Sequence, residues 1–187
     1  MVEDFEKLPI WQQFKETNSE KFNLDGHFYD ALSLLEQYYK AFPTYTLHNH
    51  RHVYNILNLI GKLLGGRVKD LSSLECIILI LSSTFHDIGM VFTNKQLSEI
   101  ENENHFTQFL DDNLKAKLQF QENGQKLNNG LAEWYCRWMH AKRVWLFING
   151  LDQNPWKKFS IRIPIGHVCE SHNGDAVSSP QFRPTGD

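Results

Sequence analysis

The chain has 187 residues, of which 41% are hydrophobic and 13% aromatic, and its formal net charge is −3. This length is enough to bury one substantial core and too short to promise two, so we expect a single domain. The 19 basic residues are scattered, which gives no strong signal for nucleic acid or an anionic membrane surface as a partner. Any anionic ligand is therefore expected to be small and locally bound.

The cysteines indicate a reducing environment. Cys76, Cys136 and Cys169 are odd in number, widely spaced and embedded in apolar patterns, which is typical of reduced core thiols and favours a cytoplasmic protein. The acidic N-terminal segment lacks the apolar stretch of a signal peptide. The longest apolar run, residues 77–81, is too short to cross a bilayer, so we expect no membrane partner.

Apolar residues recur at helical spacing along nearly the whole chain, and strand-like alternation is hard to find. The sequence therefore predicts an all-α fold, a single compact bundle of about six helices. The polar segment 109–130 is expected to be a loop with a short helical piece. Breaks rich in Gly, Pro and Asn separate the expected helices, which cover roughly residues 28–40, 50–64, 73–86, 95–108, 131–149 and 158–172.

The end of the chain has a different composition. After Gly174 the periodicity is lost and two prolines occur. We predict a helical domain over residues 1–175 and an irregular tail over residues 176–187. An ending of this kind is what a truncated chain would show.

Three histidines fall within the segment TLHNHRHVYNIL, residues 46–57. If a helix begins near Asn49, His48 and His52 lie on one side of it and His50 points roughly the opposite way. At most two of the three can then share a site. The alternative is a solvated helix start in which the imidazoles bond to the backbone.

The pair His86 and Asp87 follows the very apolar segment SLECIILILSSTF and directly precedes Ile88 and Gly89, where the helix should end. A neutral imidazole beside a carboxylate at the end of a buried helix is costly without a partner, and a divalent cation is a suitable one. Nitrogen and oxygen ligands together suit zinc, manganese, iron or nickel better than calcium. The alternative is a histidine favoured by the helix dipole and an aspartate that caps the next turn.

His140 lies between Arg137 and Arg143, and all three share one face of a predicted helix. This grouping fits a face that meets an anion, a metal or acidic side chains. The alternative is a salt-bridged face whose partner is Glu75, Glu99 or Glu133.

The remaining histidines divide into one candidate and three others. His172 lies in the last turn before Gly174, where it could be a ligand in a cleft or a helix cap. His167 is rotated away from it and is expected in the core or on the surface. His27 and His105 lack polar neighbours in the sequence and are expected to have no functional role.

These positions together resemble the HD superfamily of metal-dependent phosphohydrolases, whose signature is a His on one helix and a His-Asp pair that closes a later helix. His52 and the string His86-Asp87-Ile88-Gly89 match this signature at a spacing typical of the family. The resemblance implies one or two divalent ions (Mn, Fe, Ni, Zn or Mg). One is expected to be held by His52, His86 and Asp87, and Asp87 would bridge to a second held by His140 and His172.

Two further elements refine the resemblance. Residues 48–52 are similar to the His-Asn-aromatic-x-His element of cyclic-nucleotide phosphodiesterases, which implies that His48 protonates the leaving oxygen. Residues 137–143 and 169–174 resemble an HD branch in which the domain precedes an Hsp90-like ATPase, which implies an ATPase domain or separate chain as a partner. The chain departs from the family pattern in the Asp that normally closes the first metal site, for which Asp175 is the only nearby residue, and in Met90, where some branches have Lys.

The expected function is hydrolysis of a phosphomonoester or phosphodiester, with a nucleotide as the favoured substrate. Asp87 and His48 would act in catalysis, and Arg137 and Arg143 would bind phosphate oxygens. The alternative is a catalytically degenerate HD module that serves as a nucleotide sensor or a protein-interaction domain. A purely structural helical protein with incidental histidines is a third reading.

Overall fold

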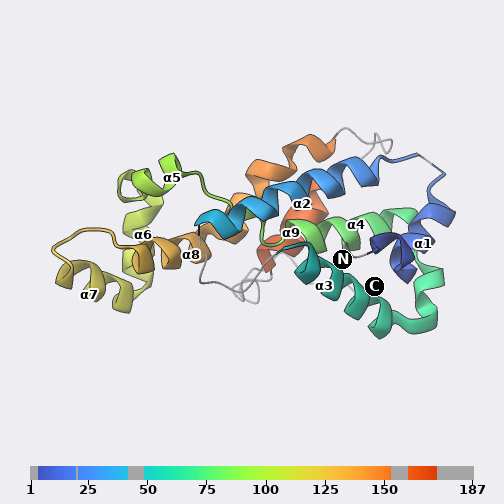
Figure 1. The fold of residues 1–187 in the computed structure, drawn as a ribbon, viewed down its shortest axis with the longest axis horizontal. Helices are drawn as coiled ribbons and strands as arrows, with labels where there is room; N and C mark the ends of the chain where they lie inside the picture. The colour runs from blue at the N-terminus through green and yellow to red at the C-terminus, as the bar shows by residue number, and fades with distance from the viewer. Residues whose placement is uncertain (1–3, 20, 42–48, 153–159, 172–187) are drawn as a thin grey trace, which may run out of the picture.

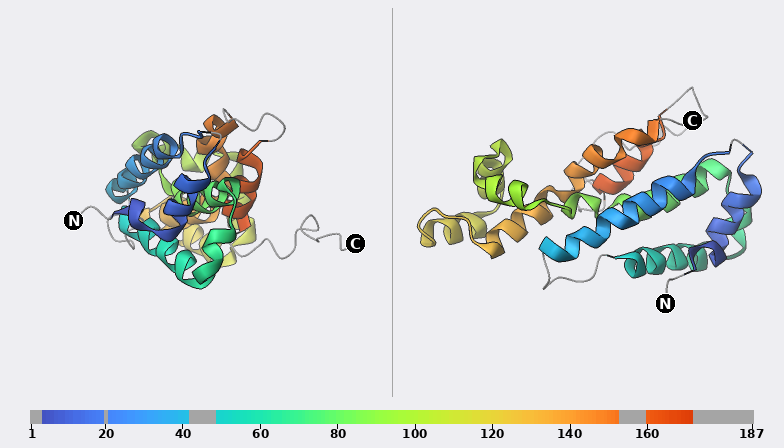
Figure 2. Two further views of the ribbon diagram at one scale, coloured as in Figure 1. Left: turned by 90° about the vertical axis from the view of Figure 1, so that its right-hand side faces the viewer. Right: turned by 45° about the horizontal axis from the view of Figure 1, so that its top comes forward.

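The computed structural model of the chain describes residues 4–19, 21–41, 49–152 and 160–171. Within these ranges the chain forms nine α-helices and five short 3-10 helices and no strand. The predicted all-α fold is confirmed, although the described part of the chain alone holds more helices than the expected six. Figures 1 and 2 show an elongated molecule with α1 near one end and α5, α6 and α7 at the other.

Helix α4 (Ser73–Phe85) is the centre of the larger part of the molecule. It begins at a capping box, in which the Ser72 hydroxyl accepts the Glu75 N–H and the Glu75 carboxylate accepts the Ser72 N–H. It contacts four helices: α1 (Pro9–Thr17), α2 (Leu24–Ala41), α3 (His50–Leu64) and α9 (Arg162–Ser171). Because α4 is covered on several sides, its sequence is apolar almost all round rather than along one stripe.

The same burial accounts for the one membrane-like segment found among the described residues. Ser73–Met90 is long and apolar enough to span a bilayer, but 67% of it is buried inside the protein. This is the pattern of a core helix.

All three cysteines are also buried and unbridged, and burial raises the pKa of the Cys76 thiol to about 11.

Helix α8 (Asn129–Phe147) runs between the two ends of the molecule (Figure 1). Its first half packs against α6 (Asn104–Asp112) and α7 (Leu114–Glu122), which follow α5 (Asn94–Glu99) and the 3-10 helix η4 (Ile100–Asn102). We call α5 to α7 and the first half of α8 the aromatic arm, because ring contacts join its helices. The rings are Phe106, Phe109, Phe120, Trp134, Tyr135 and Trp138.

The second half of α8 packs against α9 and against the 3-10 helix η3 (Ile88–Met90) that follows α4. The contact with η3 is a direct approach of two backbones. A Cβ atom at Gly89 would lie 1.8 Å from the carbonyl oxygen of His140. Only glycine permits this approach, and it brings the end of α4 against the middle of α8.

The N-terminal helices complete the core. Trp11 of α1 and Phe5 of the 3-10 helix η1 (Phe5–Lys7) both contact the ring of Phe28 on α2. The Gln13 amide donates to the carbonyl of Leu71 at 2.7 Å, which ties α1 to the connection before α4. The two remaining 3-10 helices are η2 (Gly65–Asp70) and η5 (Ile148–Asp152).

The predicted helix 50–64 matches α3, and the predictions for α2, α4 and α8 differ from the structure by a few residues at their ends. The prediction of one continuous helix over residues 95–108 is wrong. The chain is interrupted there at Glu103, where the backbone is extended (φ −77°, ψ 135°). The predictions missed α1 and treated α7 only as a short piece of a loop. The end of the predicted helix 158–172 and the tail 176–187 lie outside the described residues, so the domain division stays a prediction.

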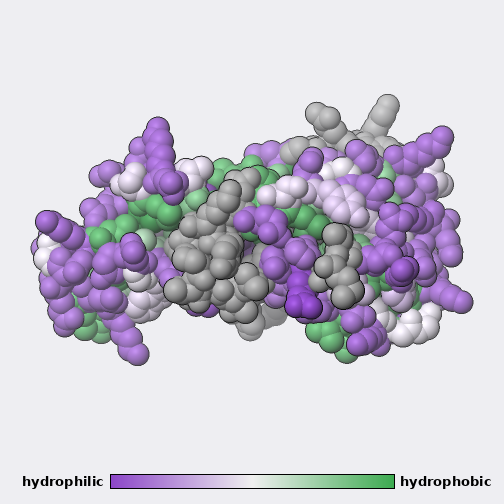
Figure 3. All heavy atoms as spheres, viewed as in Figure 1, coloured by the Kyte–Doolittle hydropathy of each residue, from purple (hydrophilic) through white to green (hydrophobic). Residues whose placement is uncertain are grey.

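Polar residues cover most of the face shown in Figure 3, and apolar residues appear there as separate patches. Among the described residues, the most exposed large apolar side chain is that of Leu63 at the end of α3, at 86%. Isolated apolar side chains of this kind are normal on protein surfaces.

Candidate metal centre

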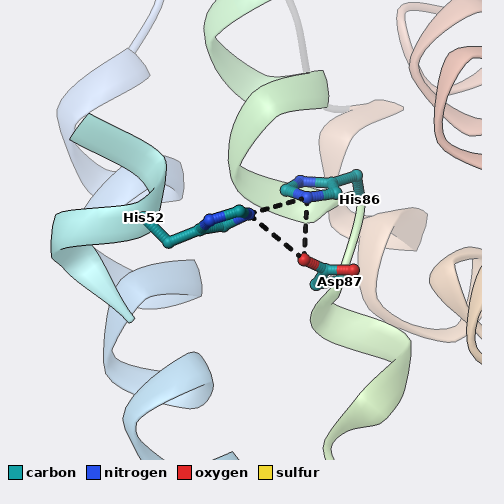
Figure 4. Close-up of side chains that lie close together, drawn as sticks. All are labelled: His52, His86 and Asp87. Carbon is teal, nitrogen blue, oxygen red and sulfur yellow. Dashed lines mark hydrogen bonds and ion pairs between the residues drawn. The ribbon is translucent and has the colours of Figure 1, made fainter. Parts of the chain in front are cut away.

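His52 is placed by the cap of its helix. The Asn49 side chain accepts the N–H groups of Arg51 and His52 at 3.1 and 3.4 Å, so α3 begins at His50 as predicted. His52 in the first turn lies at the end of α4 (Figure 4). His50 is engaged elsewhere, with its Nδ1 2.9 Å from a carboxylate oxygen of Glu36 on α2.

His86 and Asp87 lie where α4 ends and η3 begins. His86 is the C-terminal cap of α4, and its Nδ1 lies 3.0 Å from the carbonyl oxygen of Ser83. Asp87 is buried at the start of η3, with 8% of its surface exposed. The turn from α4 into η3 therefore directs two polar side chains toward α3 (Figure 4).

The side chains of His52, His86 and Asp87 converge on one point (Figure 4). His52 Nε2 lies 3.3 Å from His86 Nε2 and 3.5 Å from Asp87 Oδ2, and His86 Nε2 lies 2.7 Å from the same oxygen. An ion about 2.0–2.2 Å from each ligand atom separates cis ligands by roughly 3 to 3.5 Å. Two of the three separations match this range, and the third is slightly shorter.

The chemistry of the donors also fits a cation. Both ring nitrogens of His86 face oxygen acceptors, the Ser83 carbonyl and the Asp87 carboxylate. A neutral imidazole can donate a hydrogen bond from only one nitrogen, so the second contact needs either an added proton or an ion between nitrogen and oxygen. The Nδ1 contact favours the tautomer in which Nε2 carries the lone pair that a metal would bind.

His140 approaches Asp87 from the opposite side. It is buried on α8, its Nδ1 contacts the carbonyl oxygen of Arg137, and its Nε2 lies 3.7 Å from Asp87 Oδ1. One carboxylate oxygen of Asp87 thus faces His52 and His86, and the other faces His140. This is the arrangement needed for a carboxylate that contacts two ions.

The two arginines on α8 differ in their surroundings. Arg137 is exposed, and its backbone carbonyl orients His140. Arg143 is 8% exposed, and its guanidinium lies 3.3 Å from the centre of the Phe92 ring and donates to the carbonyl oxygen of Val91 at 2.9 Å. The phosphate-binding role of both residues stays a prediction.

Cys169 on α9 lies close to the centre, and its side chain is buried. Its thiol contacts the carbonyl oxygen of Ser82 at 3.6 Å. Burial is the main cause that raises the pKa of this thiol, with the negative charges of Asp87 and Glu170 adding to it.

His48 and His172 lie outside the described residues, as does Asp175, so their roles as proton donor, metal ligand and closing carboxylate stay predictions. The sequence reasoning missed the two backbone carbonyls, of Ser83 and Arg137, that orient His86 and His140. In each case the carbonyl belongs to the residue three positions before the histidine on the same helix. That spacing could have been read from the sequence once the helices were placed.

Comparison with known proteins gives one match. The HD-CE family matches residues 42–186, so α1 and α2 precede the matched region. No curated protein matches the chain, and no solved structure does. The family match covers most of the chain and includes Asp87 and the three histidines around it, His52, His86 and His140. The chain therefore belongs to the HD-CE family of HD-type domains.

Proposed function

We propose that this protein is a metal-dependent phosphohydrolase that acts on a phosphomonoester or phosphodiester, with a nucleotide as its substrate. The observation that supports this proposal is the convergence of His52, His86 and Asp87, whose ligand atoms all lie within 4.8 Å of one another. Two neutral nitrogens and one carboxylate form a donor set suited to zinc, manganese, iron or nickel.

Asp87, His52 and His86 would hold the first ion, and Asp87 Oδ1 with His140 and His172 would hold a second. Bound there, a divalent ion would lower the pKa of water and polarise a phosphoryl oxygen. Asp87 supplies the negative charge that both positions need. The carbonyl contacts of His86 and His140 hold their rings so that Nε2 faces the ion, which reduces the reorganisation that binding requires.

The rest of the chemistry is assigned to residues near this centre. Arg137 is exposed on the same helix as His140, and its guanidinium would bind phosphate oxygens in a bidentate manner. His48 would protonate the leaving oxygen, a role that suits imidazole near neutral pH. Together these groups would stabilise the charge that develops on phosphorus and on the leaving group.

A second candidate is a sensor or interaction module that binds a nucleotide without hydrolysing it. One observation favours it: in the described part of the chain, the metal cluster contains a single carboxylate. A site with fewer negative ligands binds an ion more weakly. For a module of this kind, the proposed partner is an ATPase domain or a separate chain. The proposed location is the cytoplasm, which is in keeping with the buried, unbridged cysteines.

The test is a turnover assay on protein loaded with manganese, using a generic phosphomonoester, cyclic nucleotides and nucleoside phosphates. We expect hydrolysis by the unmodified protein and a loss of at least about 100-fold in His52→Ala. His50→Ala is the matched control, because His50 lies two residues away on the same helix but contacts Glu36. Absence of turnover on every substrate by protein with confirmed bound metal would refute the enzyme, and nucleotide binding under those conditions would support the sensor.

A further inference from the structure

The guanidinium of Arg143 is buried, and in the described part of the chain it forms no direct ion pair, although the charge of the Glu103 carboxylate acts on it from a longer distance. Its contacts are the Val91 carbonyl, at 2.9 Å from Nη2, and the face of the Phe92 ring. Its Nε is buried without a hydrogen-bond partner among the described residues. Burial is the main cause that lowers the pKa of this group, since desolvation disfavours its charged form.

Such a group is costly to the fold. A buried charge loses its hydration, and one neutral carbonyl, one ring and the more distant charge of Glu103 recover only part of that loss, since burial still lowers the pKa of Arg143. An apolar side chain of similar length could fill the same space without this cost. The arrangement therefore suggests that Arg143 has a role beyond filling space in the core.

The contacts of Arg143 lie next to the metal centre along the chain. Val91 and Phe92 directly follow η3, and η3 begins at Asp87. Gly89 in the same segment rests against the backbone of His140, one turn before Arg143 on α8. The segment 87–92 is thus held to α8 at two points, by the close approach at Gly89 and by the Arg143 contacts.

We infer that Arg143 is a positioning residue, which fixes the segment after η3 to α8 and so holds Asp87 at the spacing from His140 that a bridged pair of ions requires. The inference rests on the metal-dependent function proposed above. It assigns Arg143 a role through Asp87 and not a contact with the phosphate. Arg143 donates a directional hydrogen bond to the Val91 carbonyl, and its guanidinium lies over the face of the Phe92 ring. Together these two contacts restrict both translation and rotation of the segment.

The test compares manganese affinity and thermal unfolding of the metal-free protein in Arg143→Met, Arg143→Lys and Tyr135→Phe. In Arg143→Met we expect manganese affinity to fall about 10- to 100-fold, as for other groups that orient metal ligands. Lysine keeps the donor and the charge but not the planar stack, so Arg143→Lys should recover part of the affinity. Tyr135→Phe is the matched control, because it removes a buried contact of the same helix within the aromatic arm, and it should lower the unfolding temperature without changing the affinity.

The outcomes separate this inference from the proposed function. Manganese binding by Arg143→Met with unchanged affinity overturns the inference and leaves the proposed function standing. The same holds if Tyr135→Phe loses as much affinity as Arg143→Met, since the effect then follows stability. If Arg143→Met does not fold, unchanged affinity in Arg143→Lys overturns the inference, and reduced affinity at an unchanged unfolding temperature supports it. Absence of manganese binding by the unmodified protein overturns both proposals.

Discussion

The two halves of α8 contact their neighbours in different ways. The first half, in the aromatic arm, packs Tyr135 and Trp138 against rings of α6. The second half places His140 beside Asp87 and Arg143 beside Val91. Both halves contain buried side chains, so burial alone does not distinguish them.

The difference lies in whether the polar groups satisfy one another. In the arm, the Tyr135 hydroxyl donates to the Glu103 carboxylate at 2.5 Å, and donor and acceptor are matched. Beside the other half, the nitrogens of His52 and His86 and one carboxylate oxygen of Asp87 are directed at one another, and an added proton or a cation would satisfy them. Convergence of nitrogen and oxygen ligand atoms, and not burial, marks the half of the helix that lies beside the candidate metal centre.

The largest effect is expected from Asp87→Asn. The substitution keeps the shape of the side chain but removes the negative charge that faces His52, His86 and His140. We expect metal affinity to fall by more than about 100-fold, with unchanged helical content by circular dichroism. Asp111→Asn is the control, since Asp111 pairs with Lys117 on the exposed surface of the arm. Equal metal binding by the two variants would remove the distinction between the halves.

Gly89→Ala should affect both stability and the metal centre. The added Cβ would meet the His140 carbonyl oxygen at 1.8 Å, so η3 and α8 must separate. We expect a loss of about 1–3 kcal/mol in the free energy of unfolding, measured with urea, together with weaker metal binding. Gly66→Ala is the matched control, because a Cβ there meets no atom within 4 Å, and the change should stay within about 0.5 kcal/mol. Equal stability of the two variants would disprove the close approach.

The smallest effect is expected in the arm. Tyr135→Phe preserves the packing of the ring but removes the hydrogen bond to Glu103, which should cost about 1–2 kcal/mol in the free energy of unfolding. Metal affinity should be the same as in the unmodified protein, as measured by titration calorimetry. A loss of metal affinity here would show that the arm and the centre act as one unit.

Much of the fold follows from local sequence signals. The Asn49 cap and the apolar spacing after it predict α3 correctly, and the apolar segment before His86 predicts the buried α4. The interruption at Glu103 was missed because its cause is distant along the chain. The Glu103 carboxylate is bound by Tyr135, and the Glu101 carboxylate accepts the N–H of Leu127. Tertiary contacts of this kind override a continuous apolar pattern.

The candidate site was predictable for a different reason. His52 and the pair His86-Asp87 resemble the HD signature, and that resemblance implied a shared centre before any packing was known. The role inferred for Arg143 was not predictable in that way, since its position beside His140 suggests a phosphate contact. Only the burial of its guanidinium between α8 and Phe92 distinguishes a positioning residue from a ligand-binding one.

The most direct test of the account is a crystal structure of manganese-soaked protein with anomalous data collected at the manganese edge. We expect an anomalous peak about 2.0–2.2 Å from His52 Nε2, His86 Nε2 and an oxygen of Asp87. A structure in which these three side chains face a water molecule or one another, with no manganese among them at saturating concentration, would contradict the account.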